Sequence, residues 1–209
     1  MIDITTHSMH QLRNLQSYLN SMDYEAGPVD GLIGPLTNNA WAGFVDDILD
    51  DEVGLPTHIR MTPRGIELLK VHEGYRSHVY KCTAGFNTLG YGRNIDANPL
   101  TQAEQDWFTE DPLGCSGQLL KDDLVRFEAT LSDSKPWVAN EPPARRDALI
   151  NMTYNMGEGW LTSWPNTWAM MERGDWSGAA VAIRGSKYAK DVGNRAKQIA
   201  MMIETGEYS

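Results

Sequence analysis

The chain has 209 residues, of which 41% are hydrophobic, so it can form one large domain or a small and a medium one. Its formal net charge of −10 argues against nucleic acid as a partner, because phosphate binding needs a basic surface. No apolar run approaches the ~18 residues of a membrane-spanning helix, and we expect neither membrane insertion nor a signal peptide. Two cysteines, Cys82 and Cys115, form no CxxC pair, and we expect no disulfide scaffold, no metal and no cofactor.

Residues 1–50 predict a small helical domain. Leu12, Leu15 and Leu19 recur at helical spacing and indicate an amphipathic helix over residues 8–22. A loop rich in Gly and Pro follows, after which we expect Thr37 to begin or cap a second helix. So few residues form only a marginal core, which favours a tethered module over a catalytic one.

Residues 51–60 are expected to link this domain to a second one, residues 61–209. The surrounding run DDILDDEVGLPTH combines acidic residues with Gly54 and Pro56 and has no sustained period. A frayed helix end that continues into a loop would give the same pattern.

The second domain reads as mostly helical with one small β region. Thr62-Pro63 predicts the start of a helix and Gly74 its end. The only convincing strand pattern is HVYKCTAGFNTLGYG. Further helical patterns cover residues 118–131, 143–156, 164–173, 175–184 and 191–203. The predicted fold class is therefore α+β, predominantly helical, with a single hairpin or small sheet.

Three side chains that could take part in catalysis lie at or near the predicted hairpin. Glu73 ends the preceding helix, where the negative end of the helix dipole favours the protonated carboxyl that a general acid needs. Cys82 and Thr88 lie on either side of a turn predicted at Ala84-Gly85, so a hairpin would bring them close together. Taken singly, a Glu before a C-cap, a buried thiol and a strand Thr are all common. Together they suit glycosidic bond cleavage, which needs a proton donor and an opposing group that handles water or the sugar cation.

The loop of the first domain resembles that of the small three-helix peptidoglycan-binding domain of many cell-wall hydrolases. The matched run is LQSYLNSMDYEAGPVDGLIGPLTNNA. Its glycines let the backbone turn sharply, and Asp30 can tie the loop by accepting backbone hydrogen bonds. The resemblance implies a wall-binding loop at Asp30, Gly31 and Gly34, although a tight helix connection would need similar residues.

Residues 61–209 resemble the T-even phage-type lysozymes, glycoside hydrolase family 24. The family pattern is Glu, eight residues, Asp or Cys, five residues, Thr, and here it reads Glu73, Cys82, Thr88. The runs RRDALINM and GNRAK also match the family's central helix and C-terminal signature. The resemblance implies that those three residues are catalytic and that Arg195 pairs with Glu73. Asn151 is expected to satisfy backbone groups near the site.

The same alignment implies an ion pair between Arg93 and Asp123, as a structural feature.

The role of Cys82 stays open, because Asp is commoner at this position. A thiol with an ordinary pKa of about 8.5 is mostly protonated at neutral pH. Cys82 could act as a thiolate base for the attacking water, attack the anomeric carbon, or only shape the site while Thr88 positions water. We favour Glu73 as the acid, with Cys82 and Thr88 activating and positioning water.

The resemblance implies a phage endolysin that hydrolyses the β-1,4 bond between N-acetylmuramic acid and N-acetylglucosamine. Its expected partner is bacterial peptidoglycan, which a monomeric enzyme would reach from the host cytoplasm through a separate holin. A lytic transglycosylase that leaves 1,6-anhydro ends, a chitinase and a non-catalytic wall-binding protein are the alternatives.

Overall fold

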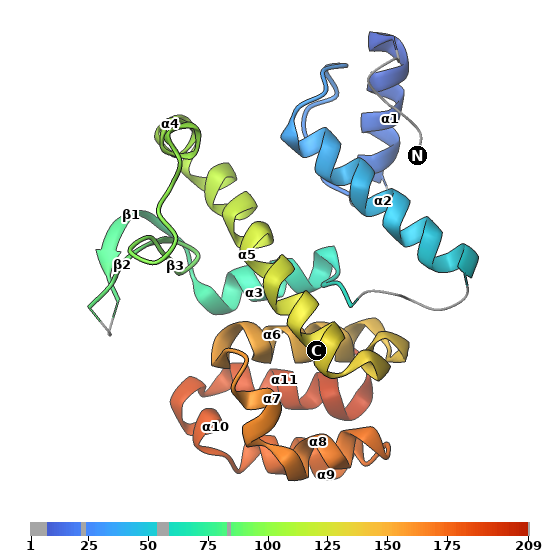
Figure 1. The fold of residues 1–209 in the computed structure, drawn as a ribbon, viewed down its shortest axis with the longest axis vertical. Helices are drawn as coiled ribbons and strands as arrows, with labels where there is room; N and C mark the ends of the chain where they lie inside the picture. The colour runs from blue at the N-terminus through green and yellow to red at the C-terminus, as the bar shows by residue number, and fades with distance from the viewer. Residues whose placement is uncertain (1–7, 22–23, 54–58, 83–84, 209) are drawn as a thin grey trace. The chain divides into compact units, whose positions relative to one another are not determined.

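The computed structural model of the chain describes residues 8–21, 24–53, 59–82 and 85–208. The chain divides into two compact units, residues 1–57 and residues 58–209 (Figure 1). Within the described ranges, no helix combines the length and the apolar character needed to cross a membrane.

The first unit contains helix α1 (Met9–Ser21), which confirms the helix predicted over residues 8–22, and helix α2 (Pro35–Val53). Its buried core includes Leu19, and a third helix is not among the residues described in this unit. Helix α2 extends into the range expected to be linker.

The expectation for Thr37 is wrong, because α2 begins two residues earlier with Pro35, a residue suited to the first helical turn. The Thr37 side chain is instead buried, and its hydroxyl donates to the backbone carbonyl of Ala26 at 3.1 Å.

The loop between α1 and α2 is tied by buried polar contacts. The Gln16 side chain is 1% exposed and donates to Asp30 Oδ1 at 3.0 Å, while its own oxygen accepts from the backbone N–H of Gly31 at 2.8 Å. Asp30 Oδ1 also accepts from the backbone N–H of Leu32 at 2.9 Å, so Asp30 ties the loop as predicted. Gly31 has φ +79°, and a Cβ there would lie 2.6 Å from a backbone oxygen. Nothing lies within 4 Å of a Cβ at Gly34, so packing does not demand glycine there.

The second unit contains the predicted hairpin as part of a three-stranded antiparallel sheet, in the order β1 (Arg76–Lys81), β2 (Asn87–Gly90), β3 (Arg93–Asn94). Tyr80 lies opposite Thr88 in the register. The third strand was not predicted, because two residues are too few to show an alternating pattern. Of the turn predicted at Ala84-Gly85, Ala84 lies outside the described residues.

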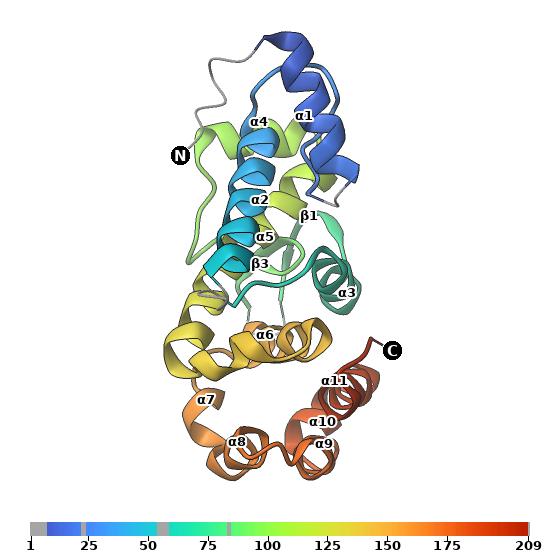
Figure 2. The ribbon, with the colours of Figure 1, turned by 90° about the vertical axis from the view of Figure 1, so that its right-hand side faces the viewer.

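Helices form the rest of this unit. In Figure 1 the sheet and α4 lie at one end of the unit and α6 to α11 at the other, with α5 running between them; Figure 2 gives a second view. The elements are α3 (Pro63–Glu73), α4 (Gln102–Glu110), α5 (Pro112–Ser134), the 3-10 helix η2 (Pro136–Asn140), α6 (Pro143–Met156), α7 (Trp160–Ser163), α8 (Pro165–Glu172), α9 (Trp176–Arg184), α10 (Lys187–Val192) and α11 (Asn194–Thr205). Leu149, Ile150 and Met152 are fully buried in the core, so α6 is its central helix.

Helix α3 begins and ends as predicted. The Thr62 hydroxyl accepts from the backbone N–H of Gly65 at 3.0 Å, Pro63 occupies the first turn, and Gly74 with φ +68° ends the helix. Just before it, Ile59 is 1% exposed and belongs to the core of this unit. Ile59 thus falls within the range expected to be linker, of which residues 54–58 lie outside the described residues.

Candidate active site

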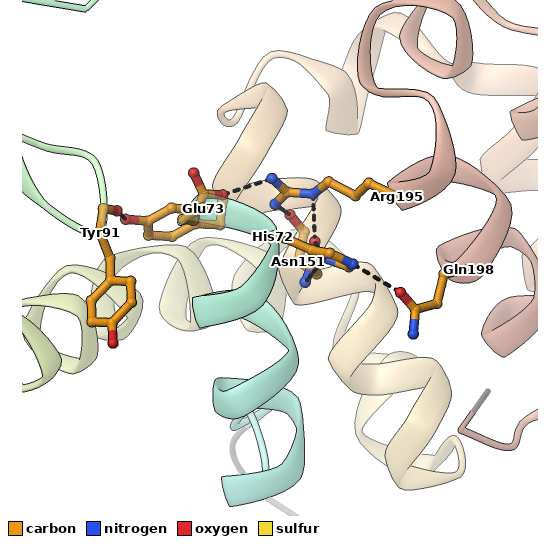
Figure 3. Close-up of polar contacts among 7 residues, drawn as sticks. His72, Glu73, Tyr91, Asn151, Arg195 and Gln198 are labelled. Carbon is orange, nitrogen blue, oxygen red and sulfur yellow. Dashed lines mark hydrogen bonds and ion pairs between the residues drawn. The ribbon is translucent and has the colours of Figure 1, made fainter. Parts of the chain in front are cut away.

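Glu73 is the last residue of α3, and Arg195 of α11 holds it. Arg195 Nη1 donates to Glu73 Oε1 at 2.7 Å, and the two side chains are only 8% and 16% exposed (Figure 3). The predicted pair is thus confirmed. Because a guanidinium is always a donor, Oε1 is committed to accepting this hydrogen bond.

The second carboxyl oxygen of Glu73 faces the turn between β2 and β3. A Cβ on Gly92 would lie 3.6 Å from Glu73 Oε2, and Gly92 has φ +90°. The positive φ favours glycine here, and a Cβ would only reach ordinary van der Waals contact with Oε2. When Glu73 is protonated, the proton resides on Oε2, because Oε1 already accepts from Arg195.

Both ends of α3 are attached to α6, which fixes the helix that carries Glu73. At the first end, Asp147 accepts from the backbone N–H of Thr62 at 2.9 Å and from its hydroxyl at 2.5 Å. At the other end, the side chains of His72 and Asn151 are in contact. Asp147 and Asn151 lie one turn apart on α6, so a single face of this helix holds both ends of α3.

Asn151 is 1% exposed and orients Arg195. Its Oδ1 accepts from Arg195 Nε at 3.0 Å, and its backbone oxygen accepts from Arg195 Nη2 at 3.4 Å. We expected the Asn151 side chain to satisfy backbone groups, and this is wrong: its recorded partners are the side chains of Arg195 and His72.

His72 and Gln198 complete this group of side chains and were not predicted as site residues. His72 Nε2 lies 3.0 Å from Gln198 Oε1, and His72 Nδ1 lies 3.2 Å from Asn151 Nδ2. Burial lowers the pKa of His72, and the nearby Arg195 cation lowers it further. Gln198 lies one turn after Arg195 on α11, which is the only signal in the sequence that could have pointed to it.

Cys82 and Thr88 come together in the hairpin, as predicted. The backbone N–H of Cys82 and the hydroxyl of Thr88 both donate to the carbonyl oxygen of Phe86, at 3.0 and 3.1 Å. Thr88 is 3% exposed and Cys82 is half-buried. Because the Thr88 proton is committed to Phe86, its oxygen is left to accept a hydrogen bond, for example from water.

Aromatic residues connect the end of β2 to the helices around Glu73. Tyr154 of α6 donates from its hydroxyl to the backbone oxygen of Tyr91 at 3.5 Å. The ring of Tyr75, two residues after Glu73, lies 5.5 Å from the Tyr91 ring. Burial raises the pKa of Tyr154, with Glu73 adding to the shift, so Tyr154 is a neutral donor.

The predicted ion pair of Arg93 and Asp123 is confirmed. Arg93 Nη1 of β3 lies 2.7 Å from Asp123 Oδ1 of α5, and the side chains are 15% and 23% exposed. Burial raises the pKa of Asp123, although Arg93 acts in the opposite direction. The pair fixes the sheet to α5.

Comparison with known proteins gives one family match. The model of the family described as phage lysozyme matches residues 70–201, a range that contains Glu73, Cys82, Thr88, Asn151 and Arg195. Residues 1–69 lie outside this match, and the role of the first unit stays a prediction.

Curated relatives agree with the family match. The pre-baseplate central spike protein Gp5 of Enterobacteria phage T4 is 27% identical over 73% of this chain, which spans only 29% of that longer protein. An endolysin of Acyrthosiphon pisum secondary endosymbiont phage 1 is 27% identical, with 66% of this chain and 86% of the relative covered. Probable T4-type lysozyme 1 of Dictyostelium discoideum is 26% identical, with 67% and 93% covered. The family model matches more than half of this chain, and the chain therefore belongs to the phage lysozyme family of glycosidases.

Proposed function

We propose that the protein is a phage endolysin whose second unit hydrolyses the β-1,4 bond between N-acetylmuramic acid and N-acetylglucosamine in bacterial peptidoglycan. Family membership and the endolysin and lysozyme relatives support this activity. The observation that carries the proposal is the asymmetry of Glu73: Arg195 donates to one carboxyl oxygen, and the other faces the turn at Gly92. A carboxyl held in this way can deliver its proton in one fixed direction.

In this mechanism Glu73 is the general acid. The glycosidic C–O bond breaks as Oε2 gives its proton to the leaving oxygen, and water then adds to the anomeric carbon. Thr88 accepts a hydrogen bond from that water, and Cys82, in its thiolate form, takes the proton that the water loses and becomes a neutral thiol. The backbone N–H of Cys82 and the hydroxyl of Thr88 donate to the same Phe86 carbonyl, and this placement of the two residues supports their acting on the same water molecule.

Mass spectrometry of the products released from purified peptidoglycan tests the role of Glu73. The wild type should release fragments with reducing N-acetylmuramic acid ends, and Glu73→Gln should lower their rate of release by about 10²–10⁴-fold, the usual contribution of a general acid. Glu67→Gln is the matched control, because Glu67 lies on the same helix with its side chain 62% exposed. Products with 1,6-anhydro ends would show that the enzyme is a transglycosylase and not a hydrolase. Full activity of Glu73→Gln would exclude Glu73 as the acid.

Two substitutions separate the roles open to Cys82. Cys82→Asp should stay active, since a carboxylate can also accept a proton from water, whereas Cys82→Ala should lose at least about tenfold in rate. Wild-type activity of Cys82→Ala would remove Cys82 from the mechanism. A covalent glycosyl adduct located on Cys82 by peptide mass spectrometry, after incubation of the wild type with substrate, would identify Cys82 as a nucleophile instead.

We propose further that the first unit binds peptidoglycan through the loop that contains Asp30, Gly31 and Gly34. The loop is held rigid by buried polar contacts, and it exposes Leu32 (60%). Co-sedimentation of the full-length Glu73→Gln protein with insoluble peptidoglycan tests this. Adding Leu32→Ser should reduce the bound fraction, whereas adding Leu113→Ser, which alters an exposed leucine of the second unit, should not. Equal binding by all three proteins would contradict the assignment.

The place of action is the bacterial wall, as for the family, and we propose that a separate holin gives access to it. Bacteria that produce the protein should lyse only when a pore-forming protein is present with it, and lysis without one would contradict this. We also propose that the protein acts as a monomer. Analytical ultracentrifugation should give a mass near 23.4 kDa, and a dimer would overturn the proposal.

A further inference from the structure

The hydrogen bonds behind Glu73 have a fixed direction, which Arg195 sets. Arg195 Nε–H can only donate, so the Asn151 amide must present Oδ1 to it, at 3.0 Å. The Nδ2 group of Asn151 is then directed to His72 Nδ1 at 3.2 Å. An amide nitrogen can only donate, so at this closer contact His72 Nδ1 is the acceptor and carries no proton.

The direction continues through the imidazole ring of His72. With Nδ1 unprotonated, the neutral ring carries its proton on Nε2, which donates to Gln198 Oε1 at 3.0 Å. The neutral ring protonated on Nε2 therefore satisfies both the contact to Gln198 and the closer contact to Asn151, which is 3.2 Å to Nδ2 against 3.4 Å to Oδ1.

A second proton on His72 would break this arrangement. The new Nδ1–H would face the donor Nδ2, and its nearest acceptor is Asn151 Oδ1 at 3.4 Å, the same atom that Arg195 Nε uses. The imidazolium and the guanidinium would then both donate to this one oxygen, and Asn151 Nδ2 would lose its acceptor. They would also repel each other, since the charged groups facing His72 are Arg195 from α11 and Glu73 from its own helix, while α6 contributes the neutral Asn151.

We propose that His72 is a positioning residue whose neutral, Nε2-protonated ring orients Asn151 so that Arg195 holds Glu73, and that protonation of His72 disrupts this hold and reduces activity in acid. This inference rests on the proposed function for its effect on catalysis. The depression of the His72 pKa by burial agrees with it, since the ring then stays neutral to a lower pH.

The pH profile of peptidoglycan hydrolysis gives the first test. Glutamine at position 72 can accept from Asn151 and donate to Gln198 without titrating. His72→Gln should therefore raise the ratio of the rate at about pH 5 to that at about pH 7.5 by at least about threefold relative to wild type. His78→Gln is the matched control, because His78 is exposed on β1 and should keep the wild-type profile. Gln198→Glu should move the acid limb the other way, to higher pH, because a carboxylate favours the imidazolium.

An NMR titration tests the contacts themselves and does not depend on hydrolysis. The Arg195 Nε–H signal, assigned by its loss in Arg195→Lys, should shift with the same midpoint as the imidazole signals of His72, and it should stay unshifted over that range in His72→Gln. An Arg195 Nε–H signal whose chemical shift does not change as His72 titrates would overturn the proposal. An acid limb shared by wild type and His72→Gln would also overturn it. If the two signals titrate together but wild type does not hydrolyse peptidoglycan, the contacts among His72, Asn151 and Arg195 are supported and the proposed function is refuted.

Discussion

Gly65→Ala should destabilise the second unit, although the same change usually stabilises a helix. Gly65 is the third residue of α3, where replacing Gly by Ala ordinarily gains about 0.5–1 kcal/mol. Here a Cβ would lie 2.2 Å from Asp147 Oδ2, well inside van der Waals contact. We therefore expect the steric cost to exceed the gain in helix propensity.

The magnitude follows from what holds Asp147 in place. Asp147 is 1% exposed, and its carboxylate accepts two hydrogen bonds from Thr62 and one from the Tyr208 hydroxyl. The carboxylate therefore cannot rotate away from a new Cβ without losing at least one of these hydrogen bonds. Losing one hydrogen bond to a charged group costs about 1.5–3 kcal/mol, and overpacking costs about 1–3 kcal/mol. After subtraction of the propensity gain, the net loss is about 3 kcal/mol, or about 6–12 °C in the melting temperature of a domain of this size.

Thermal and urea unfolding of the full chain would measure this effect. Gly117→Ala is the matched control, because a Cβ in the middle of α5 would meet only Lys70 Cε at 4.0 Å and should stabilise the unit by about 0.5–1 kcal/mol. The cost of Gly65→Ala should also shrink when Asp147→Ala is already present. A Gly65→Ala protein at least as stable as wild type would refute the reasoning.

Three further changes have defined outcomes. Arg195→Met should lower the free energy of unfolding by about 3 kcal/mol and abolish most hydrolysis, because it leaves a largely buried carboxylate unpaired; unchanged unfolding in urea would contradict this. Burial raises the pKa of Asp147 above its ordinary 3.8, so the folded protein keeps this proton to higher pH than the unfolded chain. The stability of wild type relative to Asp147→Asn should therefore fall as pH rises from about 4 to 7, and a constant difference in urea unfolding would count against it. A double-mutant cycle on Arg93→Met and Asp123→Leu should give a coupling of about 1–3 kcal/mol, and additive losses would show that the pair contributes nothing.

The local features of the fold could be read from the sequence because they depend on neighbouring residues. Thr62-Pro63 and Gly74 bound α3 as predicted, since capping needs only side chains within a turn of the helix end. Thr37 shows where such reasoning fails. A Thr near a helix start is often a cap, but here the Thr37 hydroxyl donates to the backbone carbonyl of Ala26 on the other side of the loop.

The family, the helical α+β class and the spacing of Glu73, Cys82 and Thr88 could be read from the order of the residues, because periodicity, capping and motif spacing are properties of the chain order. Which side chains hold Arg195 in place behind Glu73 could be seen only in the folded protein. His72 and Gln198 are 126 residues apart, and Asn151 and Arg195 are 44 apart, so no local pattern links them. Their contacts exist because α3, α6 and α11 pack in one core, and packing also fixes which carboxyl oxygen of Glu73 Arg195 occupies.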